Sequence, residues 1–544
     1  MTNYLNDVRH LLKSRWFVFC MLAIAVMSYG YAACNTSISI DDTEHDRYVG
    51  SGNTMLASGR FGMWFWSVVE GKWENSFLID FFAVFMLAFA CINFCILFKR
   101  VSNGKITIGA LTVFSCLFIS YPLMNEIWEY TGANVNVCGG FLLVSFSLLI
   151  IHAFIHGYRG IKGYLSLVGS AILLTLVCAG YESVVSVYVF FVFAIIALQI
   201  IYQKENKLWD ILKQGFLYAG LLAAGVVLRV IIHNIILAVC NLQPVVNGAT
   251  SILWGGQPIL NTLVGLVDSF FVYYIFRAVI YFPLFVLVLS GLAFLTMGIT
   301  ACIKHGAILL LPGSGMLLSL ILFSLIQGVY SPYRICQVFA AFCAFSGMML
   351  VSSFPRDVSK SKTVLRICAL TLCGMLCFYQ STNLNYYLEL NHRRSESEAA
   401  VVRQISYDLR KGFDRDKPVV FVGTYQLSPT IYEAACVPED GFNWKLYQKL
   451  CGKYFYLCNR YFDLESLSRK GPDTNINSVI NWSVIAFGTQ DATAHLFEYY
   501  GCEYVPANLD LYLEPAQAES GNMPAYPKEG YIKDMGDYLI VNLG

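Results

Sequence analysis

Apolar runs of about 18 to 25 residues recur from the amino terminus to residue 381 of the chain. A helix crosses the hydrocarbon of a bilayer in about 20 residues, so each run is long enough to span a membrane. Charged residues make up only 13% of the sequence, about half of the usual share in soluble proteins. The pattern therefore predicts a polytopic α-helical membrane protein with about eleven transmembrane helices.

We expect the spans near residues 16–33, 77–98, 106–123, 137–155, 164–180, 183–202, 215–240, 279–303, 307–326, 334–353 and 364–381. The first run follows Arg9, Lys13 and Arg15, as a signal peptide would. Because its length suffices to span and further spans follow, we interpret it as the first transmembrane helix. The apolar segment 254–278 contains Asp268, which favours a re-entrant or interfacial helix.

Lysine and arginine residues concentrate in alternate loops, which orients the chain. The loops on one side hold only Arg47, Arg60, Lys72 and Arg334 before residue 383. The positive-inside rule then places the amino terminus and the basic loops in the cytoplasm. With an odd number of spans, the carboxyl end lies on the extracytoplasmic side. The net charge of +1 gives no reason to expect a nucleic acid partner.

From Asn383 onward the sequence becomes charged and amphipathic. A helical pattern is expected near 386–412 and 492–500, and strand-like runs near 418–423, 479–487 and 538–543. This predicts a transmembrane domain at 1–382 and a small extracytoplasmic α/β domain at 383–544. On that side of the membrane, Cys436, Cys451, Cys458 and Cys502 could pair as disulfides.

The first outer loop, residues 34–76, concentrates ionisable side chains just after the first span. They are Asp41, Asp42, Glu44, His45, Asp46 and Arg47. A carboxylate there could act as a general base at the membrane surface, with Arg47 or Arg60 holding an anion. A solvated loop accounts for the same residues about as well. The aromatic stretch 59–66 that follows favours a helix in the interface plane, which could guide a lipid headgroup or serve as an aromatic belt.

Other candidates lie in later outer loops and at the ends of spans. Glu126 and Glu129 stand among aromatic residues, which suits a sugar site or an ordinary wet loop. Ionisable groups near hydrocarbon point to function, and they include Glu182, Arg229, Arg277 and Arg334. Each arginine could bind a lipid phosphate or be a snorkelling anchor. The sequence contains no nucleotide-binding P-loop, which disfavours an ATP-driven pump.

Several short motifs resemble one family. They are Ile40-Asp41-Asp42, Gly59-Arg60-Phe61-Gly62, Gly180-Tyr181-Glu182, Tyr333-Arg334 and the stretch 523–533. Together they resemble the membrane-bound glucosyltransferase family II, the O-antigen-modifying enzymes. The resemblance implies a GT-C type glycosyltransferase in the bacterial cytoplasmic membrane. Such an enzyme moves a hexose, usually glucose, from a polyprenyl-phosphate carrier to a surface polysaccharide or cell-wall polymer, with inversion.

The resemblance also implies roles for individual residues. Asp41 or Asp42 would be the general base, while Arg334, Arg47 and Arg60 would hold the donor phosphate. Contacts to the sugar or acceptor would come from Asp46, Glu126, Glu129, Tyr181 and Glu182. Clustered acids could hold a divalent metal, but we expect no metal and no cofactor. A lipid-linked donor implies a flippase and a polyprenyl-phosphate glycosyltransferase acting upstream.

Two other functions fit parts of the pattern. A polysaccharide polymerase would also place acids and arginines in outer loops, but it would use a lipid-diphosphate donor. A lipid or glycan transporter, or a binding scaffold, would move or bind its ligand without forming a glycosidic bond. The chemistry of the donor distinguishes a polymerase from the expected glycosyltransferase. The formation of a glycosidic bond distinguishes an enzyme from a transporter or a scaffold.

Overall fold

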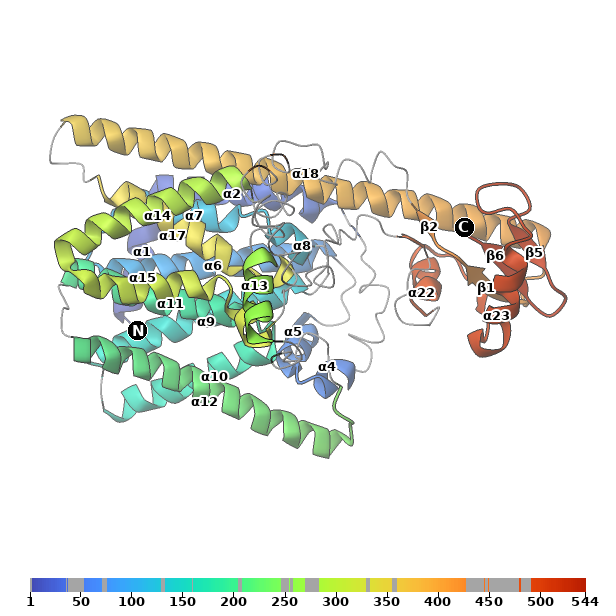
Figure 1. Ribbon diagram of the computed structural model, residues 1–544, viewed down its shortest axis with the longest axis horizontal. Coiled ribbons are helices and arrows are strands. Elements are labelled where there is room, and N and C mark those ends of the chain that lie inside the picture. Colours follow the sequence, from blue (N-terminus) through green and yellow to red (C-terminus); the bar gives the residue numbers. More distant parts are fainter. Residues whose placement is uncertain are drawn as a thin grey trace.

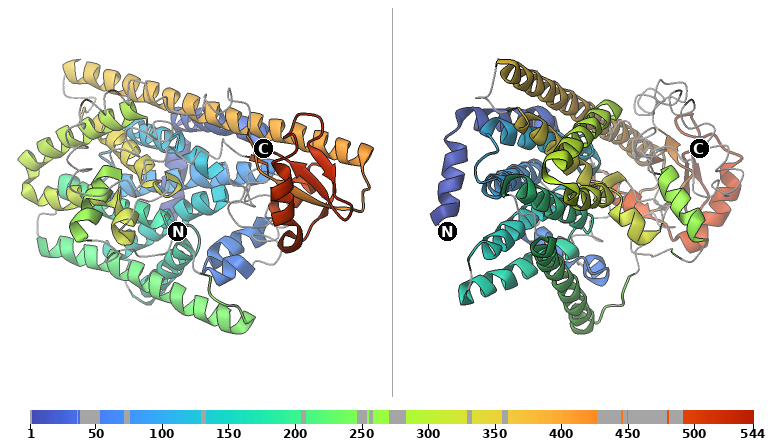
Figure 2. Two further views of the ribbon diagram at one scale, coloured as in Figure 1. Left: turned by 45° about the vertical axis from the view of Figure 1, so that its right-hand side comes forward. Right: turned by 60° about the vertical axis from the view of Figure 1, so that its left-hand side comes forward.

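The computed structural model describes residues 2–35, 37, 53–70, 76–128, 133–158, 160–203, 208–245, 254, 258–269, 283–328, 333–354, 360–426, 445, 449, 479–480 and 491–544. Its architecture is a bundle of long helices with a small mixed sheet beyond one end (Figure 1). Figure 2 shows the same arrangement from two further directions.

Eight helices in the described part of the chain are long and apolar enough to cross a membrane. They are α2 (Arg15–Cys34), α6 (Ser76–Val101), α9 (Ala133–Ile155), α10 (Ile161–Ala179), α11 (Val184–Leu198) with the π-helical turn η2 (Gln199–Gln203), α12 (Leu208–Cys240), α14 (Leu284–His305) and α18 (Lys360–Gly412). Each overlaps a predicted span. The chain is therefore a multi-pass membrane protein.

Shorter apolar helices lie where the third, ninth and tenth spans are expected. They are α7 (Ile108–Ile119), the pair η5 (Ala307–Leu309) and α15 (Leu310–Ser319), and α17 (Val338–Ser352). Each of these three pieces is shorter than 18 residues, whereas all eight long helices have at least 18. Helix length therefore supports eight spans in the described part of the chain, and the count of eleven stays a prediction. Helix α16 (Leu322–Gln327) continues the ninth run.

The bundle core is dominated by aromatic packing between α6, α7 and α11. The rings of Phe94 and Phe191 lie 4.3 Å apart, and Phe118 contacts both. Hydrogen bonds tie neighbouring helices where polar groups are buried: Tyr29 Oη donates to the carbonyl of Ile119 at 2.7 Å. Such bonds are needed because hydrocarbon offers no water to satisfy polar groups.

Short helices gather at the end of the bundle that faces the sheet. They include α4 (Asn53–Ala57), α5 (Phe61–Glu70), α8 (Met124–Trp128), α13 (Ile259–Ser269) and the single turn η6 (Tyr333–Ile335) (Figure 1). Helix α13 is the longest described piece of the ambiguous segment 254–278, and its 11 residues are too few to cross a bilayer. At the opposite end, the amphipathic helix α1 (Thr2–Leu12) is joined to α6 by an ion pair of 2.9 Å between Asp7 and Arg100.

Helix α18 runs without a break from the bundle into the carboxyl-terminal unit, through the boundary predicted near residue 382 (Figure 1). No glycine or proline interrupts the helix between residues 375 and 411, so nothing in the sequence stops it there. The long helix therefore connects the sheet to the bundle directly.

The carboxyl-terminal sheet has the strand order β4-β1-β6-β5. Its strands are β1 (Pro418–Val422), β4 (Val505–Pro506), β5 (Ile532–Asp534) and β6 (Leu539–Asn542), and a separate pair joins β2 (Tyr425–Gln426) to β3 (Val479–Ile480). Strand β1 is parallel to β4 and β6, while β5 is antiparallel to β6.

Helices cover both faces of this sheet. Val419 and Phe421 face the end of α18 and helix α22 (Asp491–Tyr499). Val420 and Val422 face helix α23 (Leu509–Ser520) instead. This alternation is what a strand buried on both sides requires, and it explains the continuous apolar run of β1.

Replacing Phe421 by alanine is expected to lower the free energy of unfolding of the sheet by about 3–5 kcal/mol. Phe421 is fully buried and contacts the rings of Phe497 and Tyr504. Pulse proteolysis of the purified full chain in denaturant would measure the change. Val505→Ala, at an exposed position of β4, is the control, and equal effects of the two variants would contradict this account of the core.

Candidate functional site

The Gly59-Arg60-Phe61-Gly62 motif forms the turn between α4 and α5. Gly59 has a φ of +76°, a left-handed conformation that favours glycine, and the amide of Arg60 donates to the carbonyl of Met55 at 2.8 Å. A β-carbon on Gly59 would also stand 3.2 Å from Nδ1 of His233. The turn therefore needs glycine both for its backbone and for the close approach of α12.

The second glycine of the motif brings α5 against the end of α10. A β-carbon on Gly62 would stand 2.7 Å from the amide nitrogen of Gly180 and from the carbonyl oxygen of Leu176. On the same helix, the ring of Trp66 lies against Gly139 of α9. Gly62 therefore places the first motif directly on the Gly180-Tyr181-Glu182 turn, although some 120 residues separate them in the sequence.

Arg229 of α12 connects these two motifs. Its Nη2 donates to Oε1 of Glu182 at 2.5 Å, and its Nε donates to the carbonyl of Gly59 at 3.5 Å. Helix α12 can approach because Gly225, one turn earlier, packs on Leu174 of α10. The two charged side chains are 22% and 24% exposed, which strengthens their attraction relative to a surface pair.

His233 lies one turn beyond Arg229 and completes this group, which we call the Arg229 cluster: Gly59, Arg60, Glu182, Arg229 and His233. Nε2 of His233 donates to the carbonyl of Ala57 at 3.2 Å, and the same carbonyl accepts from the amide of Val245 at 3.1 Å. Sequence reasoning missed His233. The available signal was its i, i+4 spacing from Arg229 within an apolar run.

A second group of predicted residues lies on α8 and η6. Glu126 on α8 is buried, and α8 packs against η6, which carries the half-buried Arg334. The ring of Trp128 stacks on Tyr29 of α2 at 4.2 Å. Helix α9 contacts both α5 and α8, so its outer end lies between the two groups.

The structure thus brings the turn that carries Arg60 close to Glu182, through Gly59 and Arg229, and separately brings together the elements of Glu126 and Arg334. Tyr181 packs partly against the bundle core beside Glu182. The remaining candidates, Asp41, Asp42, Asp46, Arg47 and Glu129, lie outside the described residues, as do Cys436, Cys451 and Cys458. Cys502 is buried, with its thiol unbonded to another cysteine of the described chain.

Among the described residues, no three histidine, cysteine or acidic side chains come close enough to hold a metal ion. The acids of the first outer loop are not among those residues. Among the described residues, the charges of Glu182 and Arg229 offset each other, and Arg60 in the adjoining turn is a further positive charge. A guanidinium group of this kind can donate to the oxygens of a small anion.

The family model described as Glucosyl transferase GtrII matches residues 30–351. The chain belongs to this family. The matched residues include both groups described above and end before the carboxyl-terminal sheet. No curated protein matches the chain. Membership makes this membrane protein a glycosyltransferase, which implies a sugar donor and an acceptor.

Gly62→Ala is expected to destabilise this GtrII member by about 1–3 kcal/mol, because the added methyl group meets backbone atoms that cannot rotate away. Gly169→Ala on α10 is the matched control, since a β-carbon there meets nothing within 4 Å. Thermal unfolding in detergent would compare the two. A Gly62→Ala protein as stable as Gly169→Ala would show that α5 does not rest on the Gly180 turn.

The ion pair between Arg229 and Glu182 should appear as a coupling free energy of about 1–2 kcal/mol in a double-mutant cycle. The cycle uses Glu182→Gln, Arg229→Gln and the double variant, with thermal unfolding as the readout. Either single variant leaves one charge in a partly apolar setting, so the second substitution should restore stability. Strictly additive effects would rule out the interaction.

Proposed function

We propose that the chain transfers a hexose, most simply glucose, from a polyprenyl-phosphate donor to a cell-surface polysaccharide or cell-wall polymer. The reaction takes place on the extracytoplasmic face of the bacterial cytoplasmic membrane. Membership in the glucosyltransferase family supports the transfer of a sugar, and the distribution of basic loops supports the side of the membrane.

The observation that carries this proposal is the contact of Arg229 with both family motifs at one end of the bundle. The cluster lies where apolar helices end, so a lipid can present its phosphate there while its chain remains in hydrocarbon. Arg60 supplies the unbalanced positive charge. Arg47 and Arg334 are the further phosphate ligands in this proposal.

Connectivity supports a catalytic role for the first outer loop. Its segment 36–52 starts from α2, which stacks on α8 through Tyr29, and ends at α4, which contacts His233. The chain that carries Asp41 and Asp42 is therefore tethered to both groups of candidate residues. Asp46, Glu126, Glu129, Tyr181 and Glu182 are the proposed contacts to the sugar and the acceptor.

In the proposed reaction, Asp41 or Asp42 accepts the proton of an acceptor hydroxyl. The hydroxyl oxygen attacks the anomeric carbon of the donor from the face opposite the phosphate. A glycosidic bond forms as the bond between the anomeric carbon and the phosphate oxygen breaks, and the configuration inverts. Polyprenyl phosphate leaves with the bonding electron pair, and the arginines stabilise its growing negative charge.

Asp41→Asn or Asp42→Asn is expected to lower kcat by at least about 100-fold, since an amide cannot accept the proton. The assay incubates purified protein with polyprenyl-phosphate glucose and the host's surface polymer and measures the change in polymer mass. Asp210→Asn is the matched control, because Asp210 is an exposed acid at the opposite end of α12.

Full activity in both single variants and in the double variant would refute the assignment of the base. Consumption of a diphosphate-linked oligosaccharide, with no use of the monophosphate-linked sugar, would instead favour a polymerase. Binding of the glycan without a new glycosidic bond would favour a transporter or scaffold.

A further inference from the structure

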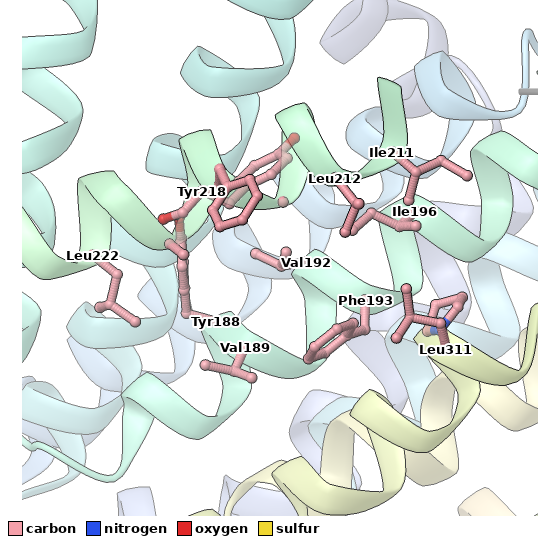
Figure 3. Close-up of a pocket in the computed structure, with 14 residues that line it drawn as sticks. Tyr188, Val189, Val192, Phe193, Ile196, Ile211, Leu212, Tyr218, Leu222 and Leu311 are labelled. Carbon is pink, nitrogen blue, oxygen red and sulfur yellow. The ribbon is translucent and has the colours of Figure 1, made fainter. Parts of the chain in front are cut away.

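A pocket of about 320 Å³ lies between α11, α12 and α15 (Figure 3). Its walls are apolar side chains, among them Val189, Val192, Phe193, Leu212 and Leu222. Two of its residues, Phe216 and Leu311, are 70% and 48% exposed, so the pocket opens through the lipid-facing surface of the bundle. An apolar cavity of this kind has no partners for water and suits a hydrocarbon ligand.

The back of the pocket is held by contacts between the helices. Tyr188 Oη of α11 donates to the carbonyl of Tyr218 in α12 at 2.9 Å, and both side chains are buried. On the other side, Gly315 of α15 lets the ring of Phe193 lie against the helix, since a β-carbon would stand 2.5 Å from that ring. The cavity is therefore a defined feature of the helix packing.

The pocket and the Arg229 cluster share helix α12, and the pocket lies closer to the amino-terminal end of this helix. Leu222 is seven residues from Arg229 along α12, and Ile211 is eighteen residues away. At 1.5 Å per residue, the pocket extends from about 10 to about 27 Å below the cluster. The proposed function places the Arg229 cluster at the membrane surface, and half of the hydrocarbon thickness is about 15 Å, so in this placement most of the pocket lies beyond the bilayer midplane.

This distance restricts which lipid can reach from the Arg229 cluster to the pocket. A lipid whose head lies at Arg229 can reach the pocket only if its chain passes the midplane, which an acyl chain confined to one leaflet does not do. A polyprenyl chain is long enough and flexible enough. We propose that the pocket between α11, α12 and α15 binds the distal part of the polyprenyl chain whose phosphate lies at the Arg229 cluster, an inference that rests on the proposed function.

Two glycines of α12 allow a matched test. Gly215 lines the pocket, whereas Gly220 is exposed on the same helix and is not part of the lining. A β-carbon meets nothing within 4 Å at either position. Phenylalanine at 215 should therefore fill the pocket and phenylalanine at 220 should point into lipid, with the same change in helix propensity. Ala219→Phe, at an exposed lining position, is a second pocket-filling variant.

The experiment measures transfer from full-length polyprenyl-phosphate glucose and from a donor whose chain is shorter than one leaflet. For the long donor, Gly215→Phe should raise KM about tenfold with kcat unchanged, as expected for excluding roughly two methylene groups. Gly220→Phe should match the wild type with both donors, and the short donor should not distinguish the three proteins.

The same proteins are also tested for retention of labelled polyprenyl phosphate during purification, which does not depend on catalysis. Weaker retention by Gly215→Phe or Ala219→Phe than by Gly220→Phe supports the pocket even if no sugar is transferred, in which case only the proposed function fails. Equal retention and equal KM values overturn the proposal. Loss of a copurified phospholipid, with polyprenyl phosphate retained, also overturns it, because an ordinary acyl chain then fills the pocket.

Discussion

A guanidinium group within apolar helices must find a partner, and that requirement organises one end of the helix bundle. Arg229 meets it with the Glu182 carboxylate and the Gly59 carbonyl, which belong to segments about 120 residues apart. The partners can approach only because Gly62 lies on the end of α10 without a side chain between them. One charge and one missing side chain thus bring together the Gly59–Gly62 and Gly180–Glu182 segments.

Much of the bundle could be predicted because the bilayer fixes the length of a spanning helix. The runs at 16–33 and 137–155 became α2 and α9 with small shifts at their ends. The structure of segment 254–278 was harder to predict, since an apolar run that contains Asp268 is compatible with both a transmembrane helix and an interfacial helix. Only tertiary packing decides between them, and the described α13 is short.

The candidate site was predictable to a smaller extent. Sequence reasoning picked out Glu182 and Arg229 as charges near hydrocarbon and Arg60 as an anion ligand in the first outer loop. It could not pair Glu182 with Arg229, because a pair across helices depends on which faces meet. It missed His233, whose one signal in the sequence is its spacing of four residues from Arg229. The close approach of Gly62 to Gly180 could not be predicted either, because the sequence shows two glycines but not that they meet.

Helix α12 links the two chemical environments that a lipid-linked donor needs. Its carboxyl-terminal half carries Arg229 and His233, which are held by α4 and the Gly180 turn. Its inner half faces α11 and α15 across an apolar pocket. Because α12 packs on α10 through Gly225, between these two regions, one helix sets the spacing of the charged cluster and the apolar pocket. A ligand that matches both regions is selected for its length as well as for its charge.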